Sequence, residues 1–212
     1  MRRSISRRRD NRRRVMEIGR GHEAIDDLRS TETREPGQPS SEELPLWRLV
    51  AEDLATYDMR LLEPGLWAVL VHRLGRRARG SRFAPFRRAT APLHAALATA
   101  VDWLWGIDLP TAVALGRRVR IWHNGATSLH ARAIGDDVHI HHDTTLGSLR
   151  ADQHRSDALP TIESGVRIES GVSILGAITV GRNAVVRANS VVLRHVAPDT
   201  VVCGVPARLV SS

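Results

Sequence analysis

Hydrophobic residues recur at every sixth position in the C-terminal half of the chain. Branched aliphatic residues, each six positions after the last, stand at Ile162, Ile168, Ile174, Val180, Val186 and Val192. A second series of small or aliphatic residues follows each of these by four positions: Val166, Val172, Ile178, Ala184, Ser190 and Val196. A period of six fits neither the 3.6 of a helix nor the 2 of an ordinary strand. It is typical of a parallel β-helix, in which each hexad gives one strand and one turn and three hexads close a triangular coil.

The same period continues upstream, with two interruptions. Further hexad positions are Leu115, Ile121, Ile134, Ile140 and Leu146. One extra residue between the second and third of these predicts a bulge near residues 122–128. The polar residues 148–160 have no repeat and predict an extruded loop, the kind of segment that often carries function on a rigid scaffold.

Beyond the repeat, turns and composition divide the rest of the chain. Residues 197–199 are expected to turn the chain out of the last coil, and residues 201–210 to add a closing strand over the core. Residues 1–41 are rich in Arg, Ser and Glu and are expected to be disordered. Residues 42–106 predict a helical domain, because apolar residues recur at three- and four-residue spacing from Leu46 to Leu54. Two further helices are expected over residues 66–74 and 86–105, and the β-helix domain then occupies residues 107–212.

Composition adds constraints on location and partners. No apolar run approaches the roughly 18–20 residues of a membrane span, and the basic start is not followed by a signal-peptide core. A single cysteine, Cys203, excludes an internal disulfide framework and fits a cytoplasmic protein. The net charge of +8 belongs largely to a tail, since nine arginines fall within the first 20 residues. We therefore expect no specific nucleic-acid partner, and leave transient contact of the tail with nucleic acid or an anionic membrane as an alternative.

Four segments carry a resemblance to a known family. They are Gly106–Gly116 (GIDLPTAVALG), Ile121–Gly125 (IWHNG), Thr144–Gly147 (TTLG), and Ser190–Arg208 with its terminal GVPAR. Over residues 46–212 the chain resembles the serine O-acetyltransferase family of hexapeptide acyltransferases. The resemblance implies a left-handed parallel β-helix with an N-terminal helical domain, and an acetyl-CoA-dependent transfer to L-serine in cysteine biosynthesis. It also implies a homotrimer with sites between subunits, and leaves open whether two trimers pair.

The resemblance assigns roles to individual residues. His123 matches the catalytic base, which takes the proton of the acceptor hydroxyl as the oxygen attacks the thioester directly, with no acyl-enzyme. Asp108 matches a site aspartate that helps hold the ammonium group of the substrate. An Asp that caps backbone N–H groups in a turn is the alternative for Asp108. Acetyl-CoA is expected along the later coils, at Gly147, Gly176, Ala177, Ala188, Gly204 and Arg208.

Two departures from the family pattern bear on the acceptor. Trp122 stands where the serine enzymes commonly have Asp before the base, and Leu159 stands where a second His precedes Pro160. His154 is a candidate to replace that second catalytic His, and Arg155 beside it is a candidate to bind a substrate carboxylate. A sugar or polysaccharide precursor is therefore an alternative acceptor. A trimeric scaffold without catalytic activity is the alternative of another class.

Histidines and the cysteine were also considered as chemical centres. The histidines cluster in the coils as His130, His139, His141 and His142. The γ-class carbonic anhydrases, which use the same β-helix, have a zinc-binding pair of histidines separated by four residues, and no pair in this cluster has that spacing. We therefore expect no metal site. His139 and His141 alternate with Ile140 and should both face outward. Cys203 has no evident base beside it and is interpreted as structural.

Overall fold

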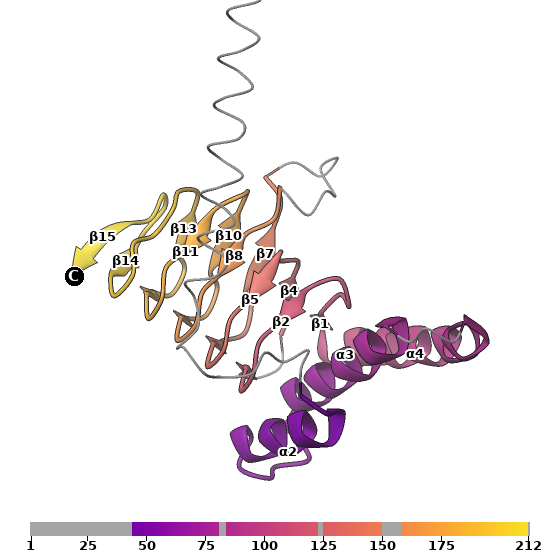
Figure 1. The fold of residues 1–212 in the computed structure, drawn as a ribbon. Coiled ribbons are helices and arrows are strands. Elements are labelled where there is room, and N and C mark those ends of the chain that lie inside the picture. Colours follow the sequence, from indigo (N-terminus) through magenta and orange to yellow (C-terminus); the bar gives the residue numbers. More distant parts are fainter. Residues whose placement is uncertain (1–43, 81–83, 123–124, 150–157, 212) are drawn as a thin grey trace, which may run out of the picture. The chain divides into compact units, whose positions relative to one another are not determined.

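The computed structural model describes residues 44–80, 84–122, 125–149 and 158–211. Three helices, α2 (Leu46–Thr56), α3 (Pro64–Gly80) and α4 (Ala84–Trp105), precede a succession of short strands (Figure 1). The strands are β1 (Ile107–Asp108), β2 (Ala114–Leu115), β3 (Arg120–Ile121), β4 (Thr127–Leu129), β5 (Ala133–Ile134), β6 (His139–Ile140), β7 (Thr145–Gly147), β8 (Thr161–Ile162), β9 (Arg167–Ile168), β10 (Ser173–Leu175), β11 (Thr179–Val180), β12 (Val185–Val186), β13 (Val191–Val192), β14 (Val201–Cys203) and β15 (Arg208–Ser211).

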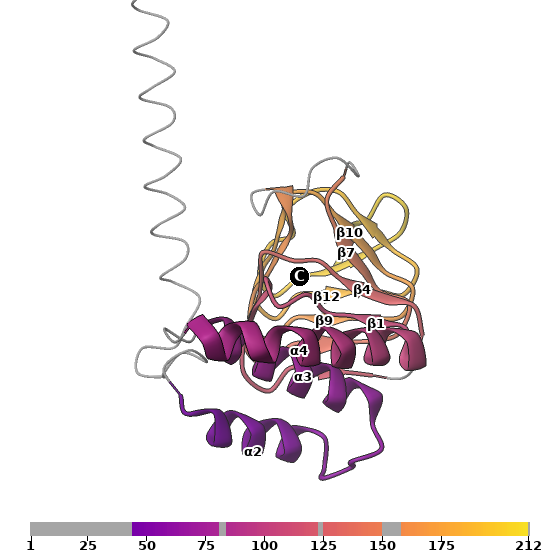
Figure 2. The same ribbon diagram turned by 90° about the vertical axis from the view of Figure 1, so that its right-hand side faces the viewer.

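Every third strand falls in the same sheet, so the coils form a three-sided β-helix (Figure 2). The first sheet, here called face A, has the order β1-β4-β7-β10-β13. Face B is β11-β8-β5-β2, and face C is β15-β14-β12-β9-β6-β3. All neighbours are parallel except β14 and β15. The prediction of a parallel β-helix is thus confirmed.

The hexad positions form the core of these coils. In the register, Leu146 lies beside Ile174, which lies beside Val192, so that equivalent aliphatic side chains stack from coil to coil. Each of the six residues from Ile162 to Val192 is at most 2% exposed. Burial of a side chain of this size stabilises the fold by about 1.5–3 kcal/mol. The inward stacking predicted from the period is therefore confirmed.

The C-terminal end differs from the expectation. The predicted single closing strand is wrong, because residues 201–210 contain two strands, β14 and β15. β14 pairs in parallel with β12 and thus belongs to the last coil, and Val196 forms a bridge with Val180 on face B. Residues 197–199 therefore turn within a coil and not out of it. Only β15 reverses direction, pairing with β14 in an antiparallel sense.

The second and third helices are longer than predicted. α3 continues from residue 74 to Gly80 and α4 begins at Ala84, before residue 86. Arginine is a good helix former, so the basic cluster up to Arg79 forms the last turns of α3, which ends at Gly80 where a break was expected. The two helices approach closely at Gly75, where a Cβ atom would lie 2.0 Å from Nε2 of His94. A larger residue at position 75 would therefore have to displace the His94 ring.

Helix α3 also covers the N-terminal edge of the β-helix. β2 is the last strand of face B at the N-terminal edge, so it pairs with β5 on one side and faces α3 contacts on the other. Arg73 donates to the carbonyl oxygens of Leu115 and Gly116 at 3.0 and 2.6 Å. Arg76 Nη1 donates to the carbonyl of Val113 at 3.0 Å, and His72 Nε2 lies 3.1 Å from the same oxygen. Buried carbonyl groups need hydrogen-bond donors. These side chains supply donors at the edge of the β-helix, where a further coil would otherwise supply backbone N–H groups.

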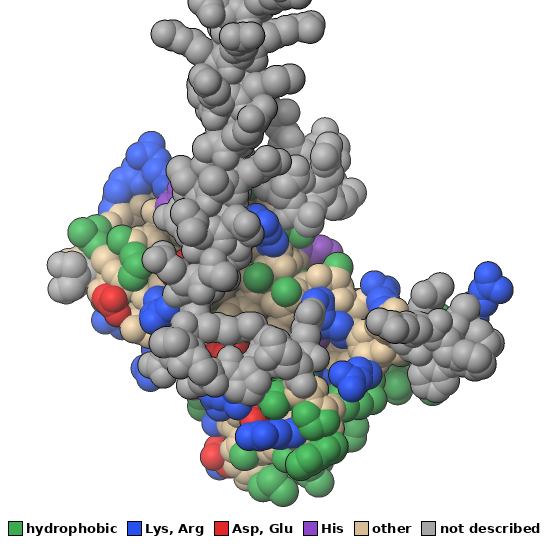
Figure 3. Space-filling model, in the orientation of Figure 1, with side chains coloured by type: hydrophobic (Ala, Val, Ile, Leu, Met, Phe, Trp, Pro, Cys, Tyr) green, Lys and Arg blue, Asp and Glu red, His purple; other side chains and the backbone are tan. Residues whose placement is uncertain are grey.

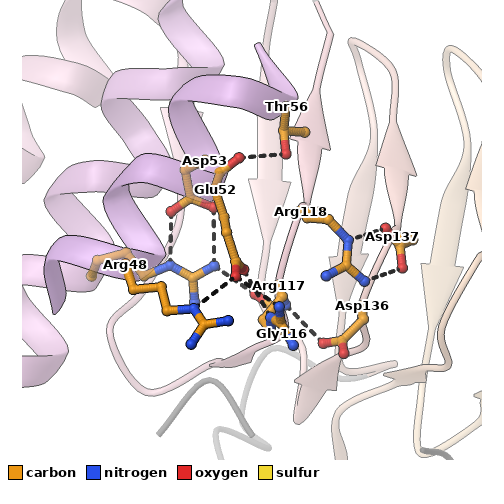
Figure 4. A network of polar contacts seen from close by, with 10 residues as sticks. Arg48, Glu52, Asp53, Thr56, Gly116, Arg117, Arg118, Asp136 and Asp137 are labelled. Atoms are coloured by element: carbon orange, nitrogen blue, oxygen red, sulfur yellow. Dashed lines mark hydrogen bonds and ion pairs between the residues drawn. The ribbon is translucent and has the colours of Figure 1, made fainter. Parts of the chain in front are cut away.

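A buried ion pair fixes the arginine that makes these contacts. Nε and Nη2 of Arg73 lie 3.1 and 3.3 Å from the two carboxylate oxygens of Asp53 in α2. Asp53 is fully buried and Arg73 is 6% exposed. Burial raises the pKa of the Asp53 carboxyl, while the hydrogen bonds and charge of Arg73 oppose that rise. A second bidentate pair, Glu52 with Arg117 at 2.7 and 2.8 Å, joins the same helix to the first coil (Figure 4).

We predict that Arg73→Met destabilises the protein by about 3–5 kcal/mol, because it leaves Asp53 as an uncompensated buried charge and two carbonyls without donors. Urea denaturation followed by circular dichroism measures the change. Arg118→Met is the matched control, since Arg118 pairs with Asp137 at 2.6 Å on the surface. That exposed pair should contribute no more than about 1 kcal/mol. Equal losses for the two variants would contradict the role assigned to Arg73.

A second prediction concerns His72. Burial, followed by the charge of Arg73, lowers the pKa of His72 from 6.5 to about 3. Below pH 6.5 His72 is therefore protonated in the unfolded chain but stays neutral in the folded chain. The free energy of unfolding decreases as the pH falls from 6.5 toward 3. Between pH 7 and pH 5 the loss from this group should be about 2 kcal/mol. Denaturation at both pH values, for the wild type and His72→Gln, isolates it: the variant should lose less on acidification, and an equal loss would refute the assignment.

Candidate active site

Face A carries the candidate acidic residue at its N-terminal edge. Asp108 ends β1 and points outward, since its neighbour Ile107 is buried in the core. Its Oδ2 lies 2.6 Å from Nε2 of His130, the residue that follows β4 on the next coil. Both side chains are about half exposed. One carboxylate oxygen of Asp108 thus contacts an imidazole on the next coil.

His130 is the functional candidate that the sequence pattern did not identify. From the sequence, His130 is only one member of a cluster of histidines in the coils. The structure separates His130 from that cluster. His139 lies in β6 on face C, whereas His130 directly follows β4 on face A. Ile107 pairs with Thr127, and the distance between them along the chain is not a multiple of six. The repeat alone therefore could not show that Asp108 and His130 meet.

A cavity of about 340 Å³ lies beside Asp108, between helices α3 and α4 and the first coil. Arg79 and Asp108 both line it, together with apolar residues such as Val71 and Ile107. A cation and a carboxylate on one cavity can bind the two charged ends of a zwitterion. The cavity thus has one cationic and one acidic side chain in an otherwise largely apolar lining.

Trp122 lies in an aromatic and basic cluster on face C. Its ring stacks on His141 at 5.8 Å and on His139 at 6.2 Å, and its Nε1 donates to Nδ1 of His139 at 3.3 Å. The guanidinium carbon of Arg120 lies 3.9 Å from the centre of the Trp122 ring. Burial, with Arg167 and Arg120 nearby, lowers the pKa of His139. The two histidines contact Trp122 on the outward side of the coils, as their alternation with Ile140 predicted.

The residues expected to contact the acyl donor lie along two corners of the β-helix. Gly147 is the last residue of β7 and Gly176 directly follows β10 on the next coil; Gly176 N donates to Gly147 O at 2.9 Å, and Ala177 comes next in the chain. Ala188 and Gly204 lie at the corner between face C and face A. Both corners border face A, the face that carries Asp108. Arg208 is apart from them in β15, on the rim of a cavity of about 410 Å³ at the C-terminal end.

Three of the predicted site residues, His123, His154 and Arg155, lie outside the described residues. Among the residues that the structure does describe, no group of three or more His, Cys, Asp or Glu side chains could hold a metal ion. No described helix is long and apolar enough to cross a membrane.

Comparison with known proteins places these features in a class. Residues 160–194 match the family described as bacterial transferase hexapeptide (six repeats), so the coils are those of a hexapeptide-repeat transferase. A serine acetyltransferase of Helicobacter pylori is 31% identical over 170 residues, which cover 78% of this chain and 94% of that protein. The chain belongs to the serine acetyltransferase family.

Solved structures of that family have the same fold. A serine acetyltransferase from Brucella abortus in complex with coenzyme A superposes with a TM-score of 0.67 at 27% identity, over 81% of this chain and 70% of that one. The Neisseria gonorrhoeae serine acetyltransferase in complex with serine superposes with a TM-score of 0.64 at 28% identity, over 78% and 69% of the two chains. The predicted left-handed β-helix with an N-terminal helical region, and the predicted family, are confirmed.

Proposed function

We propose that this protein transfers the acetyl group of acetyl-CoA to the hydroxyl of L-serine, forming O-acetylserine and coenzyme A. The similarity to curated serine acetyltransferases carries the proposal, because it extends over 78% of this chain and nearly all of the Helicobacter pylori enzyme. Such coverage spans the helices as well as the coils. The cavity beside Asp108 is compatible with it, because a guanidinium and a carboxylate, those of Arg79 and Asp108, both line it.

The acceptor is proposed to bind at the N-terminal end of face A. Asp108 uses one carboxylate oxygen to bind the ammonium group, and Arg79 attracts the carboxylate. Arg155, outside the described residues, is a second candidate for that carboxylate. The reaction needs a general base that takes the hydroxyl proton as the oxygen attacks the thioester, worth about 10²–10⁴-fold in rate. The family resemblance assigns this role to His123, with His154 as the second catalytic imidazole.

The donor is proposed to lie along face A toward the C-terminal coils. Gly147, Gly176, Ala177, Ala188 and Gly204 border this face with little or no side chain, so an extended pantetheine arm can approach the backbone. A Cβ at Gly147 would have only the Cδ2 of Leu175 within 4 Å, at 3.9 Å, which leaves open space above it. Arg208 is proposed to contact a phosphate of the nucleotide end. Backbone amides would stabilise the tetrahedral oxyanion.

We also propose a cytoplasmic homotrimer. Support comes from apolar side chains that a single chain leaves exposed along the coils and at their C-terminal end: Leu149, Leu193, Val205, Leu209 and Val210. A second apolar group lies around α2 and its connection to α3, where Figure 3 shows hydrophobic side chains gathered: Trp47, Met59, Leu61 and Leu62. This second group is available for pairing of two trimers through the helices.

Thiol release from acetyl-CoA, measured with L-serine and with a panel of sugars, tests the proposal. We expect saturable turnover with L-serine and none with the sugars. His123→Ala should lower kcat by about 10²–10⁴-fold if His123 is the base, and retained turnover would move that role to another residue.

The other outcomes distinguish the alternatives. Turnover with a sugar alone would retain the acyl transfer and reject serine as the acceptor. Binding of coenzyme A without turnover on any acceptor would reject the proposed reaction. The absence of coenzyme A binding in calorimetry would favour a scaffold without catalytic activity.

A further inference from the structure

Helices α3 and α4 together form an arm that extends past β1, the first strand of the coils (Figure 1). Residues 64–101 of this arm contain neither Asp nor Glu. They contain seven arginines: Arg73, Arg76, Arg77, Arg79, Arg82, Arg87 and Arg88. Arg73 and Arg76 bind the edge of the β-helix, whereas Arg77 in the last turn of α3 and Arg88 near the start of α4 are exposed. The arm therefore presents positive charge to solvent near the end where the two helices join.

The same arm exposes large apolar side chains. Leu93, Leu97 and Leu104 of α4 are between 41% and 62% exposed, and Trp103 is 85% exposed. Spacings of four and seven residues place the three leucines on one face of the helix. Figure 3 shows hydrophobic side chains along the lower side of the arm, with arginines on its upper side and at its end. The outer surface of the arm is therefore amphipathic.

The fold of a single chain does not use these apolar side chains. The inward face of α4 consists of other residues, since Val101 is buried and Ala98 and Trp105 pack against the core of the coils. Contiguous apolar surface of this kind on a soluble protein marks a place where a partner binds.

The charge of the arm decides which partner fits. A second copy of the arm would bring cations against cations, with no acidic side chain within residues 64–101 to offset the repulsion. A nucleic acid would match the arginines, but its phosphates would leave the leucines and Trp103 in water. An anionic lipid surface matches both features. Leucine and tryptophan enter the boundary between headgroups and acyl chains, and arginine contacts the lipid phosphates.

We propose that the α3–α4 arm binds this protein to the surface of a membrane that contains anionic phospholipids. The contact is peripheral: α4 lies in the plane of the membrane, with Leu93, Leu97 and Trp103 in the headgroup region. Arg77 and Arg88 extend along the surface to the phosphates. This binding does not depend on the acceptor of the proposed reaction, because these apolar side chains do not line the cavity beside Asp108.

Flotation of the full-length protein with lipid vesicles tests the proposal. We expect binding to vesicles of phosphatidylcholine with about one third phosphatidylglycerol, and binding at least about tenfold weaker to phosphatidylcholine alone. The double variant Leu93→Gln/Leu97→Gln should bind the anionic vesicles about tenfold more weakly or less, because two leucines no longer enter the interface. Glutamine is a good helix former and both positions are exposed, so the melting temperature should match the wild type.

A matched pair of double variants tests the charge. Arg77→Gln/Arg88→Gln should weaken binding to the anionic vesicles by about tenfold. Arg132→Gln/Arg194→Gln removes the same charge from exposed positions on the coils and should bind within about twofold of the wild type.

Four outcomes would overturn the proposal. Wild-type binding by Leu93→Gln/Leu97→Gln would attribute the contact to charge alone, for which the arginines of residues 1–20 suffice. Equal losses in the two arginine variants would show an effect of net charge and not of the arm. Binding of the wild type to RNA but not to vesicles would identify a nucleic acid as the partner. Dissociation of the oligomer in Leu93→Gln/Leu97→Gln, measured by analytical ultracentrifugation, would assign this face to contacts between copies of the chain.

Discussion

The structure depends on how the first coil satisfies its carbonyl groups. Inside a β-helix each coil hydrogen-bonds to the coils on both sides, but the first coil has a coil on one side only, and three of its carbonyls accept hydrogen bonds from α3 instead. Arg73, held by the buried Asp53, supplies donors to two of them, and His72 and Arg76 serve a third. The helices and the coils are therefore joined by polar contacts at this edge. Tyr57 adds to them by accepting a hydrogen bond from Ile121 N at 2.9 Å.

This junction also builds the candidate site. The cavity beside Asp108 exists because α3 and α4 lie against the first coil, so one wall is helical and the other is β-helix. Face A then extends from this cavity over successive coils, with outward positions occupied by short polar residues: Ser128, Thr145 and Ser173. The acceptor end is thus made by two kinds of structure, whereas the proposed donor path is made by coils alone.

The period of six was sufficient to predict the coils, because the spacing of inward residues follows directly from their geometry. It also extended further than we inferred: Val202 lies six residues after Val196 and belongs to the last coil, although Pro198 suggested a turn out of it. The Asp108–His130 contact was not predictable in this way, since the residues between them break the hexad count. The contacts of Arg73 and His72 depend on packing between α3 and the coil edge. Sequence periodicity carries no information on such contacts.

Parallel stacking gives the strands of face A a regular spacing along the axis of the β-helix. Neighbouring strands in a sheet are about 4.8 Å apart, so Asp108, His130 and Gly147, on three successive coils, occupy fixed steps along the axis. Hydrogen bonds between the coils hold each step. The separation between the two ends of the site can therefore change during evolution only by whole coils, that is, by insertion or loss of about 18 residues at once. Adaptation to a longer or shorter acceptor must then come from the helices and the turns, which are free to vary by single residues.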